Sequence, residues 1–107
     1  MNLAEWLVRT AKRQPGATAL MSGEDPVATY AGFATRAACI GAVLQTRYKV
    51  EPGDRVAVFM KNSPAYLELL YGIWFCGAAA VPINAKLHPR EAAFIIADSG
   101  SKLVFVS

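Results

Sequence analysis

The chain has 107 residues, 54% of them hydrophobic, which is enough apolar material to bury a core and makes the composition incompatible with intrinsic disorder. Eleven Lys and Arg residues against eight Asp and Glu give a net charge of +3, but these cations are scattered rather than gathered into the stripe typical of nucleic-acid binding. The composition therefore predicts one globular domain, or part of one, without a nucleic-acid partner.

The apolar stretches of the chain are too interrupted to cross a membrane. The longest uncharged one runs from Leu69 to Ile83 and contains two glycines and a proline, whereas a spanning helix needs about 20 consecutive apolar residues. The N-terminal segment carries Glu5 and lacks the continuous apolar core of a secretory signal. We therefore expect a cytoplasmic protein without a transmembrane segment.

The reactive residues do not indicate a metal or redox site. Cys39 and Cys76 lie in apolar, helical stretches without CxxC spacing, so we expect two buried, reduced thiols. His88 is the only histidine, which excludes a histidine-based metal cluster within the chain. The sequence predicts no metal-binding residue.

The first half of the chain predicts a helix, a hairpin and a second helix. Residues 3–14 are amphipathic, and short strand-like runs around turn-forming residues predict an antiparallel hairpin near residues 18–30. Thr29 is a suitable N-cap for a helix from Tyr30 to Arg47, and small residues beside its apolar face predict close packing on a neighbour. The apolar positions are Phe33, Ala37, Ile40 and Leu44, and the small ones are Ala34, Ala38 and Gly41.

The second half alternates strands with helices, which predicts a parallel βαβαβ unit over about residues 55–106. Ser63 followed by Pro64 is a typical helix start, and Gly100 is a typical helix end. The fold class is thus α/β, with this unit preceded by a helix, a small hairpin and a packed helix. The predicted elements are strands at 55–60, 79–83 and 102–106 and helices at 64–76 and 89–98.

The helix predicted at 64–76 is apolar on nearly every side, with Glu68 as its main polar exception. Such a helix is normally buried on several sides, and a chain of this size has little material to cover it. Its aromatic side chains have two interpretations, core packing or the wall of an acyl or aryl pocket. These side chains are Tyr66, Tyr71, Trp74 and Phe75.

The best candidate for ligand binding is the segment Lys61, Asn62 and Ser63. It joins the carboxyl end of a predicted strand to a helix N-terminus, and ligands of parallel sheets bind at that edge. Helix N-termini attract anions, which the lysine also favours, but the segment lacks the glycines of a phosphate loop. Capping of the helix by Ser63 explains the same residues, so an anion site and a cap remain alternative interpretations.

Three further candidates have structural explanations. Asp54 precedes its strand rather than following it, so we expect it and Arg55 to serve in a turn or a salt bridge. His88 lies just before a helix without a nearby acid or nucleophile, which predicts an exposed or capping residue. Residues 99–102 faintly resemble a phosphate loop but run from a helix into a strand, so we predict a helix-terminating turn.

Short matches along the whole chain indicate a family. Their order and spacing resemble the N-terminal part of AMP-forming acyl-CoA synthetases. The matching pieces are Ala17 to Leu20, Thr29 and Tyr30, Pro52 to Val58, Asn62 to Pro64, Gly77 and Ala78, Val81 to Asn84, and Asp98 to Val106.

The resemblance implies a parent enzyme that activates a carboxylate with ATP to an acyl-adenylate and passes the acyl group to coenzyme A. Such a parent uses ATP, Mg²⁺ and coenzyme A. The family's phosphate loop, adenylate motif, ribose-binding aspartate and catalytic lysine all lie beyond the equivalent of Ser107. The resemblance therefore gives this chain no catalytic or cofactor-binding residue.

The function that this resemblance implies is structural. Residues 1–107 are expected to be a partial N-terminal subdomain of an enzyme that ligates a carboxylate, in particular a fatty acid, to coenzyme A. We expect this part to be inactive alone and to have the rest of the enzyme as its partner. One alternative is a self-standing α/β module for nucleotide binding or interaction. Another is part of a luciferase-like, aryl-acid-activating or acyl-AMP ligase enzyme. Exposed apolar surface predicts self-association.

Overall fold

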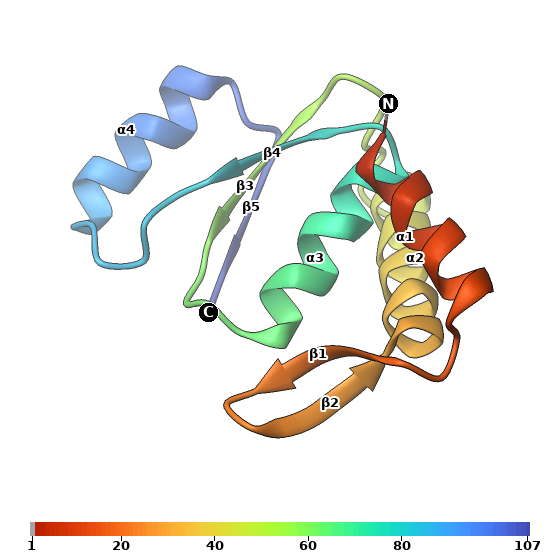
Figure 1. Cartoon of the computed structure of the whole chain (residues 1–107). Coiled ribbons are helices and arrows are strands. Elements are labelled where there is room, and N and C mark those ends of the chain that lie inside the picture. Colours follow the sequence, from red (N-terminus) through yellow and green to blue (C-terminus); the bar gives the residue numbers. More distant parts are fainter. Residues whose placement is uncertain (1) are drawn as a thin grey trace.

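The computed structural model describes residues 2–107 and confirms the α/β fold class (Figure 1). Within these residues no helix combines the length and hydropathy needed to cross a bilayer. The helices are α1 (Leu3–Arg13), α2 (Tyr30–Thr46), α3 (Pro64–Phe75) and α4 (Pro89–Ser99), and the strands are β1 (Thr18–Ser22), β2 (Asp25–Thr29), β3 (Arg55–Phe59), β4 (Ala79–Pro82) and β5 (Leu103–Val106).

The strands form two separate sheets, and the predicted antiparallel hairpin and parallel unit are both present. β1 and β2 pair antiparallel in a hairpin, and β3 lies at the centre of a three-stranded parallel sheet with the order β4-β3-β5. In the parallel sheet Val56 is aligned with Ala80 on one side and Leu103 on the other. The carboxyl ends of β3, β4 and β5 therefore lie at one edge of this sheet.

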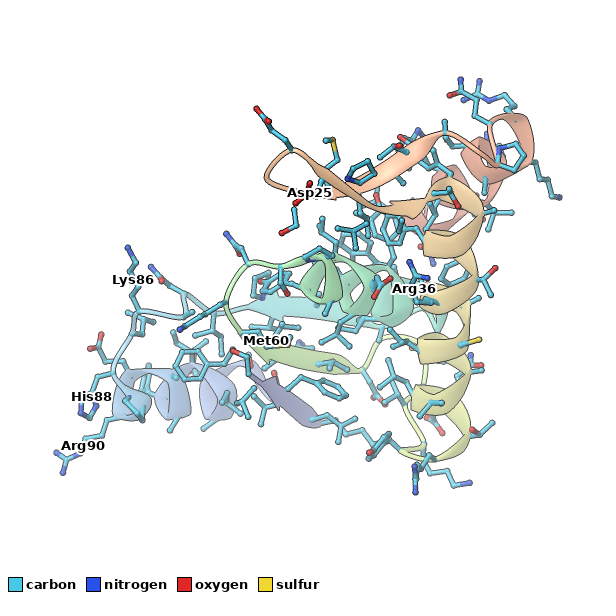
Figure 2. All side chains as sticks on the ribbon, turned by 90° about the horizontal axis from the view of Figure 1, so that it is seen from below. Asp25, Arg36, Met60, Lys86, His88 and Arg90 are labelled. Atoms are coloured by element: carbon cyan, nitrogen blue, oxygen red, sulfur yellow. The ribbon has the colours of Figure 1, made fainter. Side chains whose placement is uncertain are left out.

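The parallel sheet is covered on both faces. α4 lies on one face, and α3 lies on the other with α2 and α1 behind it, while the hairpin closes the end of this helical layer (Figure 1). Figure 2 shows the same layers from a perpendicular direction, with α4 and α2 at opposite ends of the molecule. Helix α3 is thus the middle layer.

Three groups of buried side chains hold these layers together. Leu69 and Ile73 of α3 pack with Val56 and Val58 of β3, and Leu44 of α2 belongs to the same group. On the opposite side of α3 a second group joins α1, β1 and α2, and on the far face of the sheet a third joins β3 to α4. The second group is Leu7, Leu20, Phe33 and Ala37, and the third is Ala57, Ile83 and Ala92.

Helices α2 and α3 approach each other through glycines. A Cβ placed on Gly72 would lie 2.5 Å from Cγ2 of Ile40 and 3.1 Å from the Ala37 carbonyl oxygen. A Cβ placed on Gly41 would lie 2.9 Å from the Phe75 Cβ. The predicted close packing of α2 is confirmed, but Ala38 is exposed, so Ala37 and Gly41 form the contact face.

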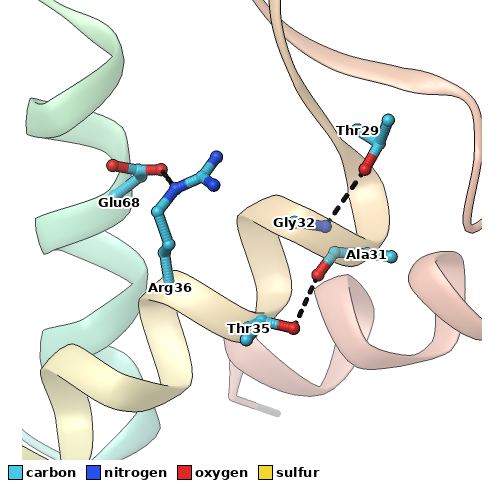
Figure 3. A network of polar contacts seen from close by, with 6 residues as sticks. All are labelled: Thr29, Ala31, Gly32, Thr35, Arg36 and Glu68. Carbon is cyan, nitrogen blue, oxygen red and sulfur yellow. Dashed lines mark hydrogen bonds and ion pairs between the residues drawn. The ribbon is translucent and has the colours of Figure 1, made fainter.

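An ion pair at the surface joins the same two helices. Arg36 of α2 donates through Nε to the Glu68 carboxylate of α3, which gives the main polar residue of α3 a partner (Figure 3). In the first turn of α2 the Thr29 hydroxyl accepts a hydrogen bond from the Gly32 N–H at 3.1 Å. Thr29 therefore caps α2 as predicted.

The ends of the other helices follow from their sequence. Ser63 caps α3 and is followed by Pro64 in the first turn, and the His88 ring caps α4. Gly77 and Gly100 follow the ends of α3 and α4 with φ angles of 76° and 68°, a region that favours glycine. The end of α4 at Gly100 is as predicted.

Two expectations about exposure are wrong. Cys39 is exposed on α2, and only Cys76 is buried. Helix α3 does not form the main exposed apolar surface, because α2, α1 and the hairpin cover the side that faces away from the sheet, and only Leu67 of its large apolar residues is clearly exposed. The most exposed large apolar side chains are Phe94 of α4 and Val106 of β5.

The glycine contact predicts that substitution by alanine lowers stability at Gly72 of α3 but not at Gly32 of α2. Gly72→Ala forces a methyl group against the β-branched Ile40 and a backbone carbonyl, and overpacking of this kind costs about 1–3 kcal/mol. The better helix propensity of alanine offsets about 1 kcal/mol of this loss in stability. We expect a net loss of up to about 2 kcal/mol in the free energy of unfolding, measured by urea denaturation.

Gly32→Ala is the matched control, since the nearest atom to its added Cβ lies at 3.4 Å. We expect the stability of this variant to be unchanged or raised. Equal shifts in the same direction for both variants would show that the α2–α3 contact is not tight.

Candidate functional site

The carboxyl ends of β3 and β4 border an open crevice of about 570 Å³. The chain leaves β3 through Lys61 and Asn62 into α3, and leaves β4 through Asn84 and Lys86 toward α4. Figure 2 shows Lys86, His88 and Arg90 at this end of the molecule, remote from Arg36. The residues that line the crevice are Met60, Lys61, Asn62, Tyr66, Pro82, Ile83, Asn84, Ala85 and Lys86.

Hydrogen bonds fix the backbone on both sides of the crevice. The Asn84 Oδ1 accepts from the Lys86 N–H at 2.9 Å, which turns the chain directly after β4. The Lys61 N–H donates to the Ser107 Oγ at 3.3 Å and so joins the end of β5 to the end of β3. The two lysines therefore extend from backbone that is held in place.

The predicted candidate Lys61, Asn62 and Ser63 divides into two roles. The Ser63 Oγ accepts from the Tyr66 N–H at 3.3 Å, so the capping interpretation holds for this residue. Lys61 and Asn62 line the crevice, and anion binding by them stays a prediction. The same crevice brings Lys86 and Asn84 to this site, and neither was a candidate from the sequence.

The other candidates lie where the sequence predicts. Asp54 sits at the amino edge of the sheet, where its Oδ2 accepts from the Glu51 N–H at 2.8 Å and pairs with the Lys102 Nζ at 3.3 Å. The turn at Gly100 is closed by the Ser101 N–H, which donates to the Ile96 carbonyl at 3.2 Å. Both groups are at the edge opposite the crevice and have structural roles.

The aromatic residues of α3 serve mainly in the core. Tyr71 packs edge to face on Phe33, with ring centroids 5.1 Å apart, and on Trp74 at 4.9 Å. Burial raises the pKa of the Tyr71 hydroxyl and also that of the Cys76 thiol, so neither group ionises readily near neutral pH. Only Tyr66 of these aromatics lines the crevice.

The residues that line the crevice do not by themselves fit a nucleoside triphosphate with its Mg²⁺ ion. Its lining, within the part of the chain that the structure describes, contains no carboxylate that could hold Mg²⁺ and no glycine-rich backbone that could cradle phosphates. Across residues 2–107, no three His, Cys, Asp or Glu side chains gather into a metal-binding group. The arrangement can attract an anion through Lys61 and Lys86, and its lining contains no carboxylate, histidine or cysteine.

Residues 7–107 match the family described as AMP-binding enzyme. The chain belongs to this family. It is 40% identical over 102 residues to a feruloyl-CoA synthase of an Amycolatopsis species, a match that covers 95% of this chain and 20% of that protein. The chain thus spans about a fifth of the length of this relative.

Solved structures of the AMP-binding family share the fold. The chain superposes on a fatty acyl CoA synthetase of Mycobacterium tuberculosis with a TM-score of 0.90 and 39% identity, covering 98% of this chain and 21% of that one. The N-terminal domain of FACL13 from the same organism gives a TM-score of 0.91 and 38% identity, covering 99% and 27% of the two chains. The architecture is that of a part of the N-terminal domain of an acyl-CoA synthetase.

The Ser63 cap predicts the effect of two substitutions. Ser63→Ala removes the acceptor for the Tyr66 N–H and should lower the free energy of unfolding by about 1 kcal/mol, measured by urea denaturation. Ser63→Asp keeps a capping oxygen at the same position and should leave stability nearly unchanged. If Ser63→Ala keeps its stability but loses binding of inorganic phosphate in calorimetry, the anion interpretation replaces the cap.

The Asp54 turn predicts a dependence of stability on pH. The hydrogen bond from the Glu51 backbone, with help from Lys102, holds the pKa of Asp54 below its ordinary value of 3.8. The contribution of a depressed carboxyl pKa is complete above that value and is lost as pH falls through the folded-state pKa. Asp54→Asn should therefore be destabilising at neutral pH and nearly neutral in strong acid.

The measurement is urea denaturation of the unmodified protein and of Asp54→Asn at about pH 7 and about pH 2. Asp25→Asn, which changes an exposed carboxylate of the hairpin, is the control and should show a much smaller pH dependence. A destabilisation by Asp54→Asn that is equal at both pH values would contradict the assigned role.

Proposed function

We propose that this chain is the N-terminal structural portion of a cytoplasmic carboxylate CoA ligase that acts through an acyl-adenylate. The observation that carries the proposal is agreement along the whole chain: 95% of it aligns with a feruloyl-CoA synthase, and 98% superposes on a fatty acyl CoA synthetase. Similarity confined to one motif would support only a local likeness. This similarity includes every helix and strand.

In this proposal the chain supplies architecture and the rest of the enzyme supplies chemistry. Several polar groups of the described residues serve in caps, turns and surface pairs, among them Thr29, Ser63, Glu68 and Asp54. ATP, Mg²⁺ and coenzyme A would bind mainly to the four fifths of such enzymes that this chain does not match. Residues 1–107 are accordingly a partial subdomain whose first partner is the remainder of the ligase.

The acid substrate of the parent enzyme is proposed to be a fatty acid. The solved fatty acyl CoA synthetase supports this choice, whereas the feruloyl-CoA synthase supports an aromatic acid.

A second candidate function is a small anion-binding module. The observation in its favour is the pair Lys61 and Lys86 on one crevice at the carboxyl edge of the sheet. Calorimetry with ATP, AMP and coenzyme A separates the two functions. Saturable micromolar binding that is lost in Lys61→Ala/Lys86→Ala would favour the module.

A chimeric enzyme tests the proposed function. In it, this chain replaces the aligned N-terminal segment of the Mycobacterium tuberculosis fatty acyl CoA synthetase. Because the two segments share their fold, we expect the chimera to form fatty acyl-CoA with a kcat/KM within about tenfold of that of the host. A tenfold difference corresponds to about 1.4 kcal/mol in transition-state stabilisation. The measurement is thioester formation with ATP and coenzyme A.

Two controls accompany the chimera. The host without the segment should be inactive, which shows that the segment is needed. The chimera's folding is checked by thermal unfolding. A chimera that unfolds cooperatively at the same temperature as the host enzyme, but forms neither adenylate nor thioester, would contradict the proposal.

A further inference from the structure

The outward side of α1 combines apolar and cationic side chains. This helix lies on the outside of the helical layer, and its buried residues face the rest of the molecule (Figure 1). The buried residues are Ala4, Leu7 and Thr10. The exposed side chains of α1 include Leu3, Trp6, Arg9, Lys12 and Arg13.

Trp6 is held in place although it is exposed. Its ring packs edge to face on Tyr30 with the ring centroids 6.4 Å apart, and 44% of the residue remains open to solvent. Leu3, about one turn earlier on the helix, is 49% exposed. A tryptophan with one side on the protein and the other in water is typical of surfaces that meet a membrane interface or another partner.

The cations of α1 have few partners. Arg9 lies 3.7 Å from the Glu5 carboxylate, with both side chains more than half exposed, and a pair of this kind contributes little. Lys12 and Arg13 form no ion pair with any residue between 2 and 107. The helix dipole favours cations in a last turn, but it does not account for an exposed tryptophan and leucine beside them.

The same cations make the outward side of α1 a poor seat for the rest of the ligase. Lys and Arg are almost never fully buried unless they are paired, so a covering domain would have to supply several carboxylates. An uncharged groove of about 390 Å³ between α2 and β5 suits an intramolecular cover better. Its lining residues are Cys39, Ile40, Val43, Leu44, Tyr48, Leu69 and Phe105.

We propose that α1 binds the surface of an anionic membrane. Trp6 and Leu3 would enter the interface between headgroups and acyl chains, and the cations would contact the lipid headgroups. Trp6, Arg9 and Arg13 are spaced by three and four residues, so they lie on one side of the helix. With 11 residues α1 is too short to span a bilayer and lies along its surface. This role goes beyond the ligase function and does not depend on it.

Sedimentation of the 107-residue protein with lipid vesicles tests the electrostatic part. We expect binding to vesicles that contain phosphatidylglycerol, weaker binding as salt is raised, and little binding to phosphatidylcholine alone. Each cation near an anionic surface contributes about fivefold, so Arg9→Gln/Lys12→Gln/Arg13→Gln should weaken binding about a hundredfold.

The matched control removes the same charge elsewhere. Arg47→Gln/Lys49→Gln/Arg90→Gln changes three exposed cations outside α1 and should leave binding nearly unchanged. Thermal unfolding verifies that both triple variants are folded. Equal weakening in the two variants would mean that net charge alone drives binding, and it overturns the proposal, as does a lack of binding by the unmodified protein.

Quenching of tryptophan fluorescence by brominated lipids tests the apolar part without the triple variants. Trp6 and Trp74 are the two tryptophans, and quenching in the unmodified protein should disappear in Trp6→Phe, which keeps a ring against Tyr30. Binding without quenching indicates a general site for polyanions, such as a nucleic acid, and overturns the proposal.

The chimeric enzyme shows whether α1 stays accessible in a whole ligase. The substitutions at Arg9, Lys12 and Arg13 should weaken its binding to the same vesicles and leave thioester formation in solution intact. Vesicle binding by a folded chimera that these substitutions do not change would mean that α1 is covered, which overturns the proposal. An inactive chimera that still binds through α1 would instead contradict only the ligase function.

Discussion

The close contact of α2 with α3 is the constraint on which the rest of the structure depends. At Gly41 and Gly72 the two helices leave no room for a Cβ, because Ile40, Phe75 and backbone carbonyls occupy that space. This approach lets α2 reach past α3, so that Leu44 joins the sheet-side core while Phe33 packs on the opposite side. One tight interface thus connects two buried groups through a single helix.

The position of α3 as a middle layer explains its sequence. A helix between a sheet and a second helix must be apolar on both sides, and its few polar groups must find partners at the rim. Glu68 meets Arg36 there, and the Cys76 thiol, which lies inside, donates to the Ile73 carbonyl at 3.1 Å. The most exposed large apolar side chains therefore lie away from α3, at Val106 of β5 and Phe94 of α4.

The sequence predicted local features well because local chemistry determines them. Ser63 with Pro64 sets the start of α3, and Gly100 sets the end of α4, through bonds made within a few residues. Which side chains are exposed, and which of them come together at one site, depends on distant parts of the chain. Cys39 looked buried because its neighbours are apolar, and Lys86 was missed, although the carboxyl ends of parallel strands always share an edge.

We propose that this member of the AMP-binding family supplies a scaffold, while the rest of the enzyme supplies the catalytic groups. Its strand-end crevice holds two lysines but no carboxylate among the described residues, while Ser63 caps α3 and Asp54 pairs with Lys102. The most direct measurement is exchange of labelled pyrophosphate into ATP, with carboxylic acids present, by the 107-residue protein whose folding has been verified by cooperative unfolding. The account predicts no exchange above a protein-free control, and exchange above that control would contradict it.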